Sequence, residues 1–232
     1  MRVATFNVQH ARRPDGAVDV DALANACAGL AADVLALQEV DRSVPRSGRR
    51  DLAAEVARRC GAAFAFASAR PLDGGAYGNA VLVRGRIGEV RALRLPRRGR
   101  REPRGALLAR VVVAGTALGV AATHLGTDQT ESARQLAAVL RALRDLPRPW
   151  LLLGDLNRHP DQVLDAVTGA GLDLVGGPPT YPAGAPVARI DHVALAGLRA
   201  ERVDVVPAPV SDHRPLVVEV APAGAGATVD LR

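Results

Sequence analysis

Short apolar runs of strand length dominate the chain, and amphipathic helical patterns are few. Several runs alternate apolar and polar positions, which is the pattern of a strand buried on one face. We predict eleven strands, over residues 2–7, 33–38, 62–67, 79–83, 87–94, 106–113, 117–123, 149–154, 192–196, 200–206 and 215–220. We predict four helices, over residues 19–31, 51–60, 129–145 and 160–169.

The order of these elements indicates the fold class. Asp19 or Asp21 is the expected N-cap of the first helix, because a short acidic side chain accepts hydrogen bonds from the free N–H groups of the first turn. The four predicted strands between residues 79 and 123 follow one another without a helix, so we expect antiparallel hairpins there. So many strands with so few helices favour an α/β sandwich of two mixed, mainly antiparallel sheets with helices outside.

One domain accounts for nearly all of the chain. At 232 residues the sequence is long enough for one full-sized core, and no Pro/Gly-rich linker divides it. We expect a domain over residues 1–221 and a disordered tail over 222–232, where small and polar residues prevail. The N-terminus lacks the apolar stretch of a signal peptide, and no uncharged apolar run has the length of a membrane span. We expect a soluble, cytoplasmic monomer without membrane insertion.

The net charge of +6 says less about partners than its distribution does. All thirty basic residues are arginine, which together with the many alanines indicates a coding bias rather than selection for nucleic acid. Seven arginines do gather between residues 91 and 104, namely Arg91, Arg94, Arg97, Arg98, Arg100, Arg101 and Arg104. This stretch is either a solvated basic loop or a loop that attracts phosphate groups.

Polar side chains interrupt the predicted strands at their ends. The C-terminal ends carry Asn7, Gln38, Glu39, His124, Asp155 and Asn157. Asp191 and His213 instead precede their apolar runs. Because antiparallel strands bring N-terminal ends to the edge where their neighbours' C-terminal ends lie, all these side chains can converge on one edge.

This set of residues has a chemical logic. Asp155 follows three leucines, and a carboxylate at the end of a buried strand is costly without a cation nearby. Oxygen donors favour Mg²⁺ or Mn²⁺, whereas Cys27 and Cys60 stand apart without zinc-site spacing and are expected to be core thiols. Glu39 is the first expected metal ligand. Two histidines and an Asp-x-Asn beside such an ion suit hydrolysis of a phosphate ester.

Each residue also has a structural interpretation when it is considered alone. Asn7 can cap a turn, Glu39 can be a solvated residue after a strand, and His124 can be a core histidine. Residues 211–215 can form a turn, since Ser, Asp and Pro are turn formers. Coincidence at all of these positions is far less expected than at any one of them.

Seven short motifs, taken in order, resemble the endonuclease/exonuclease/phosphatase superfamily. They are TFNV with Asn7, LALQEVD with Glu39, YGNAVL with Asn79, ATHLG with His124, GDLN with Asp155 and Asn157, RIDHV with Asp191, and SDHRP with Asp212 and His213. The resemblance runs from about residue 2 to residue 220, nearly the whole chain. The resemblance implies a four-layered α/β sandwich and a Mg²⁺-dependent phosphoesterase.

The resemblance also implies roles for single residues. Glu39 is the expected principal metal ligand, with Asn7 beside it and Asp212 near the metal. Asp155 is expected to orient or deprotonate the attacking water, and Asn157 to hold a phosphate oxygen.

For the histidines, the resemblance implies that His213 contacts the scissile phosphate while Asp191 fixes its tautomer and favours its protonated form. His124 is implied as the second phosphate-side histidine and a candidate general acid for the leaving oxygen. Asn79 is a candidate substrate-binding residue or a brace for the backbone of the site. Arg104 is a second candidate for substrate binding, since EPRGAL leads directly into a strand.

The substrate stays open at this point. The histidine in ATHLG makes the chain similar to the branch that includes general nucleases, sphingomyelinase-like enzymes and phosphatases. A phosphodiesterase or nuclease acting on DNA or RNA is the leading hypothesis, and a phosphomonoesterase on a small or lipid-derived phosphate is the alternative. A non-catalytic nucleic-acid-binding module on the same scaffold is the hypothesis from another class. An aromatic content of 3% does not favour a base-stacking platform.

Overall fold

Two six-stranded sheets form the centre of the protein, and the computed structural model describes residues 1–224. The first sheet holds β1 (Arg2–Asn7), β2 (Val34–Arg42), β3 (Ala63–Leu72), β4 (Gly75–Val83), β11 (Leu198–Val205) and β12 (Leu216–Pro222). The second holds β5 (Arg86–Arg94), β6 (Gly105–Val113), β7 (Thr116–His124), β8 (Trp150–Asp155), β9 (Asp173–Leu174) and β10 (Asp191–Ala196). The strand orders are β11-β12-β1-β2-β4-β3 and β5-β6-β7-β8-β10-β9.

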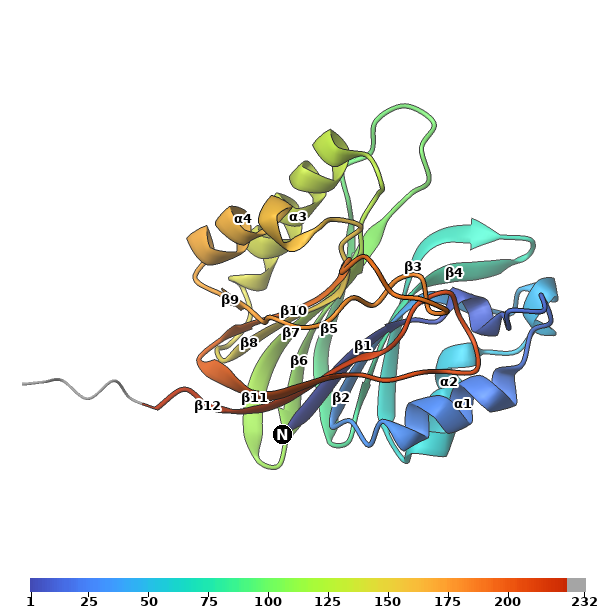
Figure 1. The fold of residues 1–232 in the computed structure, drawn as a ribbon, viewed down its shortest axis with the longest axis horizontal. Helices are drawn as coiled ribbons and strands as arrows, with labels where there is room; N and C mark the ends of the chain where they lie inside the picture. Colours follow the sequence, from blue (N-terminus) through green and yellow to red (C-terminus); the bar gives the residue numbers. More distant parts are fainter. Residues whose placement is uncertain (225–232) are drawn as a thin grey trace, which may run out of the picture.

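Helices cover the outer face of each sheet, which makes four layers (Figure 1). The helices are α1 (Val20–Gly29), α2 (Leu52–Cys60), α3 (Gln129–Leu143) and α4 (Leu164–Gly169), with short 3₁₀ turns η1 (Gln9–Ala11), η2 (Pro45–Ser47) and η3 (Pro160–Gln162). α1 and α2 pack on the first sheet, and α3 and α4 on the second. In the part of the chain that is described, none of the helices has the length and apolar character needed to cross a membrane.

The predicted sandwich is confirmed: β1–β2 and β7–β8 are parallel, and the other pairs are antiparallel. Side chains such as Val3, Val120 and Leu151 fill the space between the sheets and are fully buried. Each such side chain contributes about 1.5–3 kcal/mol of hydrophobic stabilisation. Cys27 is on the buried face of α1, and Cys60, the last residue of α2, is partly buried against the same cluster. Both thiols therefore belong to the core between the helices and the first sheet.

Two details of the predicted elements are wrong. The expected hairpin between strands 79–83 and 87–94 does not form, because β4 lies in the first sheet and β5 in the second. The chain crosses between sheets at Gly85, where a Cβ atom would lie 2.1 Å from the carbonyl oxygen of Val112. The helix predicted over 160–169 is divided into η3 and α4, and the two-residue strand β9 was not predicted. The other predicted strands and helices form, with Asp19 as the N-cap of α1.

The last strand of the described residues is β12. β12 runs to Pro222, one residue past the expected boundary at 221. Most of the expected tail, residues 225–232, lies outside the described part of the chain.

The alternation of the strands positions the polar residues. On β1 and β8, Val3 and Leu153 point into the space between the sheets, and Asn7 and Asp155 follow on the same faces of their strands. His124 lies beside Asp155 in the parallel β7–β8 register, and Asp191 lies opposite Asp155 in the antiparallel β8–β10 register. The polar residues therefore replace apolar ones at one end of the inter-sheet core.

Candidate active site

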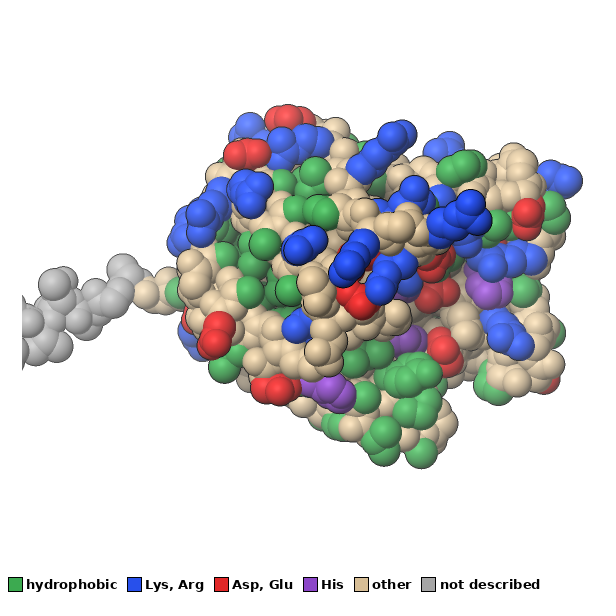
Figure 2. Space-filling model, turned by 90° about the horizontal axis from the view of Figure 1, so that it is seen from above, with side chains coloured by type: hydrophobic (Ala, Val, Ile, Leu, Met, Phe, Trp, Pro, Cys, Tyr) green, Lys and Arg blue, Asp and Glu red, His purple; other side chains and the backbone are tan. Residues whose placement is uncertain are grey.

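The open end of the sandwich forms a hollow with ionisable walls. Figure 2 shows histidine and carboxylate side chains in this hollow and arginines around it. Asn7, His124, Asp155, Asp191 and His213 are all at least 95% buried there. Polar groups buried to this extent require partners, so their hydrogen bonds define the chemistry of the site.

A β-bulge brings Glu39 into the site. Leu37 pairs with Ala80 and Val40 with Gly78, so Gln38 and Glu39 both oppose Asn79. Glu39 has φ 57°, in the left-handed region. A bulge re-aims side chains, and here the carboxylate Oε1 of Glu39 accepts a hydrogen bond of 3.0 Å from Nδ2 of Asn7.

Asp155 stands at the centre of the site. Its Oδ2 accepts a hydrogen bond of 3.0 Å from Nδ2 of Asn7 and lies 3.4 Å from Nε2 of His124 and 3.7 Å from Nε2 of His213. Its Oδ1 accepts a hydrogen bond of 2.9 Å from the backbone N–H of Asn157. The Asp-x-Asn spacing thus closes a tight turn, with Asn157 at φ 50°.

The environment of Asp155 makes its carboxylate more basic than usual. Burial raises its pKa, and the charge of Asp191 raises it further. The charge of His213 and the hydrogen bond from Asn7 act in the opposite direction but do not outweigh these causes. A carboxyl group with a raised pKa is suited to accept a proton near neutral pH.

His213 and Asp191 form a buried pair. Nδ1 of His213 lies 2.8 Å from Oδ2 of Asp191, whose Oδ2 also accepts a hydrogen bond from the hydroxyl of Thr180. Burial alone would lower the pKa of His213, but the hydrogen bond and charge of Asp191 and the charges of Asp155 and Asp212 raise it to about 9. His213 is therefore a cation at neutral pH, with Nε2 directed toward Asp155.

His124 has the opposite electrostatic character. Burial lowers its pKa well below the ordinary value, and the charges of Arg104 and His213 lower it further. NH1 of Arg104 lies 3.0 Å from Nδ1 of His124. The guanidinium at Nδ1 and the side-chain NH2 of Asn157, 3.1 Å from Nε2, can both only donate, so they compete for the single lone pair of the neutral ring. The carboxylate of Asp155, 3.4 Å from Nε2, favours the tautomer with the ring proton on Nε2.

Two sets of residues can hold a cation. Within residues 1–224, neither Glu39 nor Asp212 forms an ion pair, although the protein contains thirty arginines. These carboxylates are oxygen donors that fit a hard divalent ion. The amide oxygen of Asn7 accepts a hydrogen bond from the backbone N–H of Gln9 and keeps a second lone pair. Asp155, Asp191 and His213 also offer atoms within 4.8 Å of one another. In that group a metal would have to displace the proton of His213, whose Nδ1 is already paired with Asp191, so the Glu39 side of the site fits better.

Some predicted residues are less directly connected. Asn79 donates a hydrogen bond of 2.8 Å to the backbone oxygen of Gly105, which ties the two sheets together beside the site. Asp212 is half-buried, and among the described residues its carboxylate has no hydrogen-bond partner. Arg104 contacts His124 and forms an ion pair of 3.1 Å with Glu102.

Thr180 and Tyr181 also contact the site and were not predicted from the sequence. Thr180 donates to Asp191, and the ring of Tyr181 lies 4.9 Å from the ring of His213 between centroids. Both are in a Pro/Gly-rich loop without periodicity, so only the spacing of PPTYP from the RIDHV motif hinted at them. His192 is a core histidine: its Nε2 lies 2.7 Å from the backbone oxygen of Arg158, and burial lowers its pKa to about 4.

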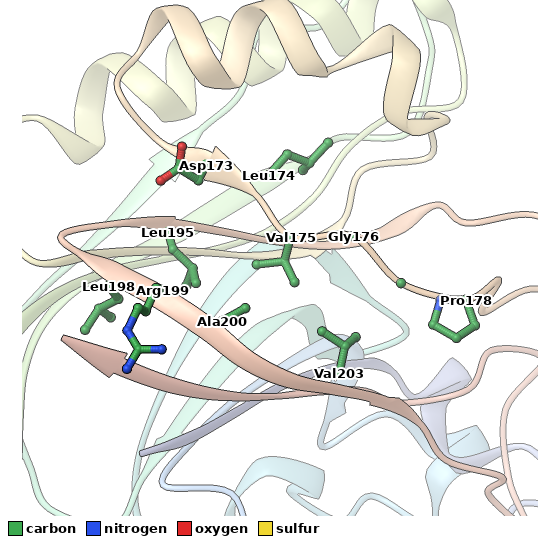
Figure 3. A pocket seen from close by; sticks show the side chains of 11 residues that line it. Asp173, Leu174, Val175, Gly176, Pro178, Leu195, Leu198, Arg199, Ala200 and Val203 are labelled. Carbon is green, nitrogen blue, oxygen red and sulfur yellow. The ribbon is translucent and has the colours of Figure 1, made fainter. Parts of the chain in front are cut away.

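A separate cavity of about 540 Å³ lies between β9, β10 and β11 (Figure 3). Its walls include Leu174, Val175, Leu195 and Val203, with Asp173 and Arg199 at the edge. Leu195 pairs with Leu151, four residues along β10 from the Asp191–Asp155 pair. The cavity is mostly apolar and carries none of the site residues, so it is separate from the candidate active site.

Comparisons with known proteins agree with this geometry. In solved structures, the chain is similar to an endonuclease/exonuclease/phosphatase from Beutenbergia cavernae, with 27% identity, a TM-score of 0.83, and coverage of 97% of this chain and 72% of the other. The human nocturnin catalytic domain with bound sulfate has a TM-score of 0.76 at 18% identity, with coverage of 96% and 93%. The Bacteroides thetaiotaomicron mannosyl-6-phosphatase has a TM-score of 0.75 at 18% identity, with coverage of 95% and 99%.

Sequence comparison gives the assignment directly. A search of curated proteins finds no match. The model of the endonuclease/exonuclease/phosphatase family matches residues 4–213, which include every residue of the candidate site. The chain therefore belongs to the endonuclease/exonuclease/phosphatase family.

Proposed function

We propose that the protein is a metal-dependent phosphodiesterase that hydrolyses phosphate esters by attack of a water held by Asp155. The observation that carries the proposal is the position of Oδ2 of Asp155, which lies between the amide of Asn7 and the Nε2 atoms of His124 and His213. A basic carboxylate, two imidazoles and neutral amides at one point are what this reaction requires.

Asp155 orients the water and accepts its proton as the water oxygen attacks phosphorus. Its raised pKa supports this role, and its hydrogen bonds with Asn7 and Asn157 fix its orientation. The bond from phosphorus to the leaving oxygen breaks in the same displacement, and the alkoxide that departs takes a proton from solvent water. Asn157 is placed to donate its side-chain amide to a phosphoryl oxygen, beside Nε2 of His124.

The two histidines stabilise charge on the phosphoryl oxygens. Both Nε2 atoms lie within 3.7 Å of Asp155, so a phosphoryl group does not fit between them and the base. An in-line displacement places the leaving oxygen opposite the attacking water, so this arrangement disfavours His124 as its general acid. His213 supplies a full positive charge, and neutral His124 supplies an N–H donor.

The cation belongs beside Glu39, whose Oε1 accepts a hydrogen bond from the same Nδ2 of Asn7 that donates to Asp155. Glu39 and Asp212 would hold it, with Asn7 beside them, because their oxygen donors suit Mg²⁺ or Mn²⁺. When bound, a hard divalent ion supplies positive charge for the phosphoryl and leaving oxygens.

A phosphomonoesterase acting on a small phosphate is the second candidate. One observation favours it: in the 91–104 stretch, Arg91, Arg101 and Arg104 already pair with Asp145, Asp128 and Glu102. Only part of the basic loop is therefore free for a polynucleotide. One protein of similar fold is a mannosyl-6-phosphatase, which shows that the fold also occurs in a phosphomonoesterase.

A substrate panel tests the proposal. The purified protein is assayed with Mg²⁺ or Mn²⁺ on bis-p-nitrophenyl phosphate, p-nitrophenyl phosphate, plasmid DNA and RNA, with Asp155→Asn as the inactive control. We expect metal-dependent turnover of the diester that exceeds turnover of the monoester. Faster turnover of the monoester would replace the phosphodiesterase by the second candidate, and no turnover of any substrate would contradict both.

A further inference from the structure

We propose that a cavity beside the active site binds a second phosphate group of the substrate and that Arg12 recognises it. The proposal rests on the proposed function, because it assigns a substrate class to the same site. The cavity measures about 420 Å³, within the range of roughly 300–1,000 Å³ for small-molecule sites. Arg12, Arg13 and Pro14 line one side, and Pro182 and Asp212 line the other.

The cavity and the reacting centre share a wall. The backbone N–H of Gln9 donates a hydrogen bond of 3.1 Å to Oδ1 of Asn7. The hydroxyl of Ser211 donates one of 2.6 Å to the backbone oxygen of Asn7. Gln9 and Ser211 both line the cavity, and Asp212 directly precedes His213. A ligand in the cavity is therefore adjacent to a phosphate held by the catalytic residues.

Arg12 is fixed by its backbone, and its charge is available. The backbone N–H of Arg12 donates a hydrogen bond of 2.9 Å to the backbone oxygen of Gln9. The backbone oxygen of Arg12 accepts one of 2.7 Å from the backbone N–H of Ser211. Among the described residues Arg12 forms no ion pair, whereas Arg13 is paired with Asp15 at 3.5 Å and Asp19 at 3.3 Å. A guanidinium without a carboxylate partner binds phosphate through two parallel hydrogen bonds.

The turn before Arg12 has an unusual conformation. Gln9, His10 and Ala11 have φ values of 42°, 46° and 66°, and none is glycine. Such a backbone is disfavoured at each residue, and strain of this kind persists chiefly where it positions a functional group. Here the turn joins Asn7 to Arg12 within five residues, so it holds the backbone of Arg12 close to the catalytic centre.

The lining defines the chemistry of the ligand. Pro14 and Pro182 offer apolar surface to the carbon skeleton, and Arg12 offers charge to an anion. The substrate that fits is a phosphate ester whose skeleton carries a second phosphate close to the scissile one. That second phosphate can come from a neighbouring nucleotide of a strand or from a small bisphosphorylated molecule.

Matched probes test the subsite and distinguish its two sources. The first set is a dithymidine diester with no terminal phosphate, a 5′ phosphate or a 3′ phosphate. The second is adenosine 5′-phosphate against adenosine 3′,5′-bisphosphate. We expect the additional phosphate to raise kcat/KM by about tenfold in at least one set, as a charge-assisted contact does. An advantage in the first set indicates a strand, and one in the second indicates a small molecule.

Variants assign the effect to Arg12. In Arg12→Gln the advantage should fall to less than about twofold, while turnover of bis-p-nitrophenyl phosphate stays at the parent level; Arg12→Lys should retain part of it. Arg86→Gln, an exposed arginine at the far end of β5, is the matched control and should keep the full advantage. No advantage in the parent, or one that survives in Arg12→Gln, would overturn the proposal.

A binding measurement keeps the subsite testable if the proposed function fails. In EDTA buffer, calorimetry compares the affinities of the parent and Arg12→Gln for adenosine 3′,5′-bisphosphate and adenosine 5′-phosphate. The parent should bind the bisphosphate more tightly, and Arg12→Gln should bind both alike. Equal affinities in the parent would contradict the subsite, whatever the substrate panel shows.

Discussion

Nδ1 of His213 lies 2.8 Å from Oδ2 of Asp191, and both side chains are buried. This contact holds the imidazole in its charged form, so we predict that Asp191→Asn lowers the pKa of His213 from about 9 toward or below its ordinary value. Activity should decline on the alkaline side as His213 loses its proton, and this decline should begin at lower pH in Asp191→Asn. A pH series of kcat at saturating metal measures it.

The contact between His213 and Asp191 should also make the free energy of unfolding depend on pH. Because the folded-state pKa of His213 is raised above 6.5, its stabilisation is fully present below pH 6.5 and is lost as pH rises through about 9. The difference corresponds to a contribution on the order of 3 kcal/mol at most. Urea unfolding of the parent and of His213→Gln between pH 6 and 10 checks this. A gap between the two that does not narrow with pH would contradict the charged pair.

Removal of the metal should abolish activity. EDTA should stop turnover and Mg²⁺ or Mn²⁺ should restore it. Glu39 contacts Asn7 of the site and Asp212 directly precedes His213, and neither carboxylate has a cationic partner among the described residues. Glu39→Gln should raise the metal concentration for half-maximal rate by about tenfold or more, since charge of the ligands governs affinity. The exposed Glu201→Gln is the control. If Glu39→Gln needs the same metal concentration for half-maximal rate as the parent, the ion is instead held by the group of Asp155, Asp191 and His213.

Replacing Asn79 should lower the stability of the fold, because its side chain holds the two sheets together beside the site. Its side chain is buried and donates to the oxygen of Gly105, so Asn79→Ala should lower the free energy of unfolding by about 1–2 kcal/mol. The exposed Asn25→Ala should change it by less than about 0.5 kcal/mol. Chemical denaturation compares them. A stable Asn79→Ala variant with lost activity would show that Asn79 binds substrate instead.

The arginine-rich stretch 91–104 distinguishes a polynucleotide substrate from a small one. Arg97, Arg98 and Arg100 are exposed and form no ion pair within residues 1–224, so a polynucleotide would contact these three. Replacing them together with Gln should raise KM for DNA or RNA and reduce the salt slope of binding by about 0.7–0.9 per lost contact. Replacing Arg84, Arg86 and Arg110 removes the same charge elsewhere and should leave the slope unchanged. Equal slopes for the loop variant and the parent would make the loop a solvated surface.

Much of the fold and of the site could be predicted from the sequence, because both follow the alternation of strands. Asn7, His124 and Asp155 continue inward apolar positions. The parallel register of β7 and β8 places His124 beside Asp155, and the packing of the two sheets brings Asn7 to them. Asp191 and His213 lie at the same edge because β10 and β12 run antiparallel to their neighbours.

Other features depend on contacts that a local pattern does not encode. The bulge that turns Glu39 inward needs a left-handed residue that is not glycine, and sequence offers no signal for it. The passage of the chain between sheets at Gly85 depends on close packing against Val112. Burial and the contact with Arg104 lower the pKa of His124, and that contact joins the start of one strand to the end of another.

The measurement that tests the central claim most directly is kcat of Asp155→Asn on bis-p-nitrophenyl phosphate at saturating metal. The substitution keeps the size of the side chain and removes its basic carboxylate, so kcat should fall by roughly 10²–10⁴, the range for loss of an acid–base group. The circular dichroism spectrum should stay that of the parent, and the exposed Asp165→Asn should retain full activity. A folded Asp155→Asn variant with kcat near that of the parent would contradict the proposal that Asp155 activates the water.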